Sequence, residues 1–197
     1  MAAIESGLYQ PGDRLTEAEV AQRLSLSRTP VREAMRRLEA ENIIVHRPRI
    51  GAVVRTLEQT ELVELYEMRL VLERTAAEMA AKHALPAEVD AMDELNAQLS
   101  NAFGDPAQAA ALNQRFHSAM FTAGRNRFLL DSARAINNAL LLLGPTTLAD
   151  AARNKTVVSQ HQAMIDAIRA GDGDRAGDAA ESHLQASLRH RLAVMRA

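Results

Sequence analysis

The stretch Ser27-Arg-Thr-Pro-Val-Arg-Glu-Ala34 decides the fold of the N-terminal part of the chain, because it starts an amphipathic helix with basic side chains at its beginning. Pro30 suits the first turn of such a helix. Arg32 and Arg36 stand one turn apart, away from the apolar side. That side is an unbroken stripe at helical spacing, formed by Val31, Ala34, Met35 and Leu38.

The segments around this helix complete a recognisable order. Thr16-Glu-Ala-Glu19 has the pattern of a capping box and predicts a shorter helix before it, with Val20, Ala21 and Leu24 facing inward. After it, residues 43–45 and 52–54 have the character of two short strands around a basic turn. The order helix, turn, helix, β-hairpin predicts a winged helix-turn-helix.

Such a motif places its second helix in the major groove of DNA, with the first side chains of that helix at the base edges. Arg28 and Arg32 are the predicted base contacts, because a guanidinium pairs bidentately with guanine. Ser27 and Thr29 are expected to bind phosphate oxygens, aided by the helix N-terminus. Further DNA contacts are predicted at Arg14, Arg36, Arg49 and Gly51. The alternative for each residue alone is a solvated arginine surface on a small helical domain.

Charge and composition favour the DNA-binding interpretation. The chain carries a net charge of −2, yet seven arginines and three acidic residues fall between Ser27 and Arg55. A local basic patch on an acidic chain is typical of a nucleic-acid surface. The absence of cysteine excludes disulfides and thiolate metal sites. No apolar run approaches the roughly 18 residues of a membrane span, and no signal-peptide pattern is found, so we expect a cytoplasmic protein without membrane contact.

The rest of the chain has only helical patterns. Aromatic residues make up 3% of the sequence, and a composition this poor in strand-forming residues favours helices. We therefore predict a mainly α protein with a DNA-binding domain over residues 1–55, a linker over 56–59 and an all-helical bundle over 60–197. The predicted helices cover residues 60–82, 86–103, 107–123, 127–143 and 149–170, and a last one reaches Met195.

Histidines on these helices form a candidate metal site. Asn113 and His117 are one turn apart, and His161 lies in an apolar stripe that points it inward. His183 is on the last helix. A helical bundle builds metal sites from side chains on facing helices. Spacing alone leaves open whether these histidines converge or are separate hydrogen-bonded core residues.

The sequence resembles the GntR family of regulators. Pro11-Gly-Asp-Arg-Leu-Thr-Glu17 and the stretch from Ser27 to Ala34 are similar to the family's winged-helix domain, and residues 64–73 resemble the start of its FadR-type helical effector domain, FCD. The resemblance implies a homodimer on a double-stranded DNA operator, acting as a repressor that a small organic acid controls. Arg14, Arg28, Thr29 and Arg32 match the family pattern in place. A full helix usually precedes this pattern, so a short first helix is expected here.

The resemblance also assigns a divalent metal, zinc first and nickel or manganese as alternatives, to Asn113, His117, His161 and His183. Asn113 stands where the metal-binding branch has aspartate, so we expect weaker binding or altered metal preference. Arg69 matches an arginine of the family that would bind an effector carboxylate, and an ion pair with Glu73 is the equally weighted alternative. Arg134 with Asn137 is a second candidate.

Two other functions remain open from the sequence. One is a DNA-binding regulator whose metal is purely structural, or whose pocket holds no metal. The other is a metallohydrolase using the histidines to activate water. Against the second, no carboxylate stands within the histidine motifs as a general base, and no nucleophile elbow is found. We therefore do not expect an enzyme.

Overall fold

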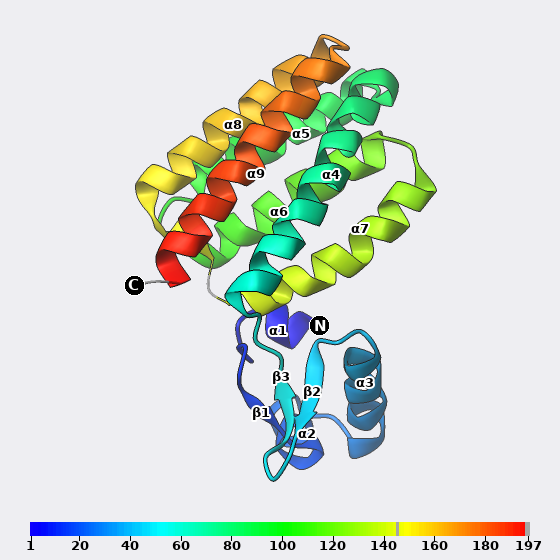
Figure 1. Cartoon of the computed structure of the whole chain (residues 1–197), viewed down its shortest axis with the longest axis vertical. Helices are drawn as coiled ribbons and strands as arrows, with labels where there is room; N and C mark the ends of the chain where they lie inside the picture. Colours follow the sequence, from blue (N-terminus) through cyan, green and yellow to red (C-terminus); the bar gives the residue numbers. More distant parts are fainter. Residues whose placement is uncertain (145, 196–197) are drawn as a thin grey trace. The chain divides into compact units, whose positions relative to one another are not determined.

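The computed structural model describes residues 1–144 and 146–195. Its helices and strands divide into two compact units. The first consists of residues 1–58 with residues 135–144, and the second of residues 59–134 and 146–195. Figure 1 shows the elements of both units, and each unit is described by itself.

The first unit is a small three-stranded sheet with short helices. Its elements are α1 (Ala2–Glu5), β1 (Arg14–Leu15), α2 (Glu17–Arg23), α3 (Arg28–Ala40), β2 (Ile44–Arg47) and β3 (Gly51–Val54). All neighbouring strands are antiparallel in the order β1-β3-β2, and Val45 pairs with Val53. The core of this unit includes Ile43, Ile44 and Val54, which are almost fully buried.

The predicted order of helix, helix and hairpin is confirmed, with local differences. Strand β1 was missed, because two residues carry no alternation and pair only with the distant β3. Leu24 does not face inward, since it lies at the C-cap of α2 and is exposed. Pro30 is the third residue of α3 rather than the first, and no hydrogen bond is lost because a helix leaves its first four N–H groups unpaired.

The second unit is a helical bundle. It contains α4 (Gln59–His83), α5 (Pro86–Asn101), α6 (Pro106–Ala123), α7 (Arg127–Leu140), α8 (Ala151–Arg169) and α9 (Gly173–Met195), with 3-10 turns at Leu141–Leu143 and Thr147–Ala149. The end of α7 and the first of these turns group with the first unit. Helix α9 packs along α4 and α8, and α5 packs on α6 and α8 (Figure 1).

Two helices of the bundle begin with an aspartate cap. Asp105 caps α6 by accepting from the Gln108 amide at 3.0 Å, and Asp150 caps α8 by accepting from the Arg153 amide at 2.9 Å. With that cap in place, α8 runs unbroken from Ala151 through Asn154 to Arg169. The mainly α fold predicted from composition and periodicity is therefore confirmed. No helix among the described residues is long and apolar enough to span a bilayer.

Candidate functional site

The start of α3 presents the predicted DNA-contacting side chains. Ser27 is the N-cap residue with extended backbone, and its side chain makes no capping hydrogen bond. Arg28, Thr29, Arg32 and Arg36 are exposed on the first turns of the helix. Uncapped N–H groups and basic side chains at a helix start are features that favour a bound anion.

Arg32 is held in a defined orientation by Glu17 at the start of α2. Its Nε lies 2.8 Å from Glu17 Oε1, and its Nη2 lies 3.1 Å from Glu17 Oε2. The hydrogen bond from Arg32 is the main cause that lowers the pKa of Glu17. Both side chains remain accessible, with 54% of Arg32 exposed, so the guanidinium can exchange this carboxylate for a partner on DNA.

The hairpin and β1 supply the remaining predicted DNA residues. Arg14 is exposed on β1, and Arg49 is exposed in the turn between β2 and β3. Gly51 begins β3 with a φ of +95°, a backbone conformation that favours glycine. Arg49 itself has a φ of +65°, so the tip of the hairpin is tightly curved.

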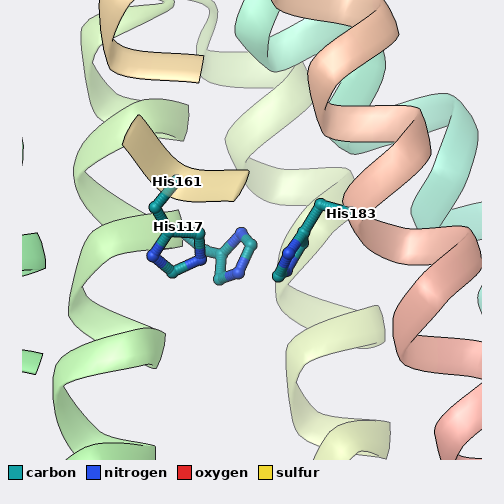
Figure 2. Close-up of side chains that lie close together, drawn as sticks. All are labelled: His117, His161 and His183. Carbon is teal, nitrogen blue, oxygen red and sulfur yellow. The ribbon is translucent and has the colours of Figure 1, made fainter. Parts of the chain in front are cut away.

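Three histidines meet inside the helical bundle. His117 on α6, His161 on α8 and His183 on α9 point toward one another (Figure 2). One candidate ligand atom from each lies within 4.8 Å of the others. The ring centroids are 4.9–5.3 Å apart, and the three side chains are buried. These three helices therefore bring together residues that are 44 and 22 positions apart in the chain.

Neighbouring side chains fix the orientation of each ring. Phe116 stacks on His161 with ring centroids 3.8 Å apart and planes 8° apart. His183 Nδ1 lies 3.1 Å from Gln160 Oε1, and His117 Nδ1 lies 2.7 Å from Glu73 Oε2 in an ionic contact rather than an aligned hydrogen bond. Both contacts favour a proton on Nδ1, because oxygen atoms face those nitrogens. The Nε2 atoms of His117 and His183 are then left as electron-pair donors.

The chemistry of the cluster suits a divalent cation. Burial lowers the pKa of His161 and of His183 well below the ordinary histidine value. The two imidazoles are therefore neutral, as metal binding requires. Both nitrogens of His161 and Nε2 of His117 are buried without a hydrogen-bond partner among the described residues. Three imidazoles with an open fourth position are typical of zinc.

A buried ion pair supports the cluster from α4. Arg69 Nε and Nη2 donate to Glu73 Oε1 at 3.0 and 2.7 Å. Burial alone would raise the pKa of Glu73, but the charge of Arg69 and the hydrogen bonds it donates, with a further contribution from His117, lower it to about 2. The Arg69 guanidinium also lies over the ring of Tyr66, 4.9 Å from its centroid. Arg69 therefore forms an ion pair with Glu73, which was the alternative to a role in binding an effector carboxylate.

Comparison with known proteins accounts for both units. The GntR family of bacterial regulatory proteins matches residues 1–54, and the FCD domain matches residues 64–186. This chain belongs to the GntR family. Its FCD domain covers more than half of the sequence. The family match makes the chain a transcriptional regulator with an FCD effector domain. The family and the relatives are regulators and not enzymes, so the metallohydrolase alternative is dropped.

Individual relatives agree with this assignment to the GntR family. A "Probable D-xylose utilization operon transcriptional repressor" of Paenarthrobacter nicotinovorans is 32% identical over 187 residues, which are 94% of this chain and 82% of that protein. The gluconate operon transcriptional repressor of Bacillus subtilis (strain 168) is 43% identical over 79 residues, 40% of this chain and 32% of that protein. The structure of E. coli McbR/YncC has the same fold, with a TM-score of 0.85, 23% identity and coverage of 98% of this chain and 93% of that one.

The other residues proposed for the FCD site are placed as follows. Asn113 is half-buried on α6, one turn before His117, and its side chain makes no hydrogen bond within residues 1–144 and 146–195. Arg134 is exposed on α7 and pairs with Asp131 at 3.1 Å. Asn137 is half-buried on the same helix, in the part that groups with the first unit.

Sequence reasoning overlooked two polar residues that join the FCD histidine cluster. Gln160 directly precedes His161 and contacts His183. Arg153 lies eight residues before His161, on the same face of α8, and is 7% exposed. The spacing of Arg153, Val157 and His161 was a usable signal, because positions four residues apart share a helix face. No comparable signal marked Gln160.

Proposed function

We propose that this GntR-family chain is a homodimeric transcriptional repressor whose operator binding is controlled by a small carboxylic acid at a divalent metal in the FCD domain. His117, His161 and His183 hold the metal, zinc first and nickel or manganese as alternatives, and Asn113 is the candidate for an additional oxygen ligand. The metal supplies a Lewis-acidic position for a carboxylate oxygen. The buried imidazole nitrogens without partners are the observation that carries this proposal.

The DNA side of the proposal rests on exposed basic groups. Arg28 and Arg32 bind base edges, Ser27 and Thr29 bind phosphates, and the hairpin with Arg49 and Gly51 lies along the backbone or minor groove. Arg14 and Arg36 add phosphate contacts. Two copies are required because helix-turn-helix operators carry two half-sites. Exposed Met68 and Val71 on α4 support association with a second copy.

The effector acts by a population shift. An acid that binds better to one arrangement of the dimer lowers the share of the arrangement that fits the operator. The competing function is a DNA-binding regulator whose metal is purely structural. In that case the metal stabilises the fold, and added acids do not change DNA binding. The two proposals differ in whether any acid changes both the melting temperature and the affinity for DNA.

The experiment has a metal arm and a DNA arm, both with the full chain. Metal content per chain is measured after purification without chelators, for wild type, His117→Ala and the exposed control His83→Ala. We expect about one equivalent of metal per chain in wild type and in His83→Ala, and none in His117→Ala. Absence of metal from the wild type would refute the site. DNA selected by the wild type from a random library is then titrated with Arg32→Ala and Arg37→Ala. Arg32→Ala is expected to weaken binding about tenfold to a hundredfold, Arg37→Ala much less; equal losses refute the base contact.

A further inference from the structure

Arg153 is a buried cation that the metal site does not explain. It lies in the first turn of α8, its side chain points inward, and it is 7% exposed. Its Nη1 donates to Gln160 Oε1 at 3.5 Å, the outer limit of a hydrogen bond. Its Nε is buried and has no partner among the residues that the structure describes.

No carboxylate within residues 1–144 and 146–195 forms an ion pair with Arg153. Burial lowers the pKa of Arg153, and the charge of Arg189 lowers it further, while Tyr66 opposes both effects. Arg69, equally buried in the same bundle, has the carboxylate of Glu73. A buried guanidinium without a counter-charge is strongly unfavourable, so this position is suited to an anion that comes from outside the chain.

Gln160 connects Arg153 to the histidine cluster. One oxygen atom, Gln160 Oε1, lies 3.5 Å from Arg153 Nη1 and 3.1 Å from His183 Nδ1. The guanidinium and the His183 ring are therefore within two hydrogen-bond lengths of each other. The charge of Arg153 also acts on the rings of His161 and His183, so the guanidinium is close to two of the three histidines. The planar fork of a guanidinium matches a carboxylate in particular.

We propose that the ligand of this site is a small dicarboxylate, with one carboxylate at the metal on the three histidines and the other bound by Arg153. The inference rests on the metal site proposed above and adds the number of anionic groups that the ligand carries. Arg153 determines specificity, because a monocarboxylate satisfies the metal and leaves the buried guanidinium without its partner. Arg69 remains paired with Glu73 and orients His117.

The test compares matched acids on zinc-loaded full chain. Oxalate, malonate, succinate and glutarate are titrated against acetate, propionate, butyrate and pentanoate, with Kd from calorimetry and melting temperature as readouts. At least one dicarboxylate is expected to bind about tenfold to a hundredfold more tightly than the monocarboxylate of equal length, as a charge-assisted pair predicts. Equal affinities within each pair overturn the inference and leave the metal–acid proposal intact. Absence of binding by every acid overturns both.

Variants distinguish loss of the contact between Arg153 and the second carboxylate from a general loss of folding. Arg153→Gln is expected to abolish the dicarboxylate preference while monocarboxylate affinity and zinc content stay at wild-type values. Arg153→Lys keeps the charge and is expected to restore part of the preference. Arg175→Gln, which changes an exposed arginine of the same unit, is the matched control and should alter nothing. A preference that survives in Arg153→Gln, in protein that melts as cooperatively as wild type, overturns the assignment.

Discussion

Replacing Glu73 with glutamine tests the buried ion pair that supports the histidine cluster. The change keeps the shape of the side chain and removes its charge, so Arg69 remains buried without a counter-ion. The pKa of Glu73 is lowered from 4.5 to about 2. Because one pKa unit corresponds to about 1.36 kcal/mol, this shift is worth about 3 kcal/mol of folding stability at neutral pH. Breaking buried ion pairs commonly costs about 3–5 kcal/mol, which agrees.

The sign of the pH dependence follows from the lowered pKa. A carboxylate whose pKa is depressed by folding stabilises the native state above its ordinary pKa, and this stabilisation is lost as the pH falls toward the folded value. The difference in unfolding free energy between wild type and Glu73→Gln is therefore expected to be full above about pH 5. It should shrink between pH 4.5 and about pH 2, where the wild-type carboxyl is also neutral.

Urea unfolding followed by circular dichroism, on chelator-treated protein, measures this difference. Glu67→Gln is the control, because Glu67 is an exposed glutamate on the same helix and should change stability by less than about 0.5 kcal/mol. A loss below about 1 kcal/mol in Glu73→Gln, or a difference that does not vary with pH, would refute the argument. The same variant is expected to bind zinc about tenfold to a hundredfold more weakly, since His117 loses its orienting carboxylate.

Two further variants test the contacts that orient functional side chains. Glu17→Gln removes a carboxylate that competes with DNA for Arg32. Binding to the selected DNA, measured by fluorescence anisotropy, should therefore tighten by no more than about fivefold, as expected for an exposed pair. Weaker binding would mean that Glu17 positions Arg32 for DNA. Gln160→Ala removes the oxygen that accepts a hydrogen bond from His183 Nδ1. Zinc binding, measured by competition with a chelator, should weaken about tenfold. Unchanged zinc affinity would show that packing alone orients the ring.

Local patterns in the sequence predicted the fold better than they predicted the site. Helix α3 and the hairpin have periodicities and turn residues within a few positions, so their order was readable. Strand β1 depends on pairing with a segment nearly forty residues away, and no short window contains that information. The inward position of His161 followed from its apolar stripe. Its meeting with His117 and His183 depends on how three helices pack, and only the resemblance to a known family suggested it.

The polar neighbours of the histidines were harder to find for a related reason. Glu73 was visible only as a possible partner of Arg69 four residues earlier, because spacing within one helix says nothing of a contact with another. Its contact with His117 crosses from α4 to α6. Arg153 shared a face with His161, yet arginine at a helix start is usually solvated. Its burial could not be read from its identity.

The contact between Glu73 and His117 also has a consequence for communication along the chain. Glu73 lies on α4, the helix that follows the DNA-binding segment after four residues, and fourteen positions separate it from Gln59 at the helix start. At 1.5 Å per residue, this is a continuous rod of about 21 Å. If a ligand displaces His117, the contact with Glu73 would pass that displacement to this helix. If an acid alters operator affinity through it, thermodynamic reciprocity requires the operator to alter the affinity for the acid by the same factor.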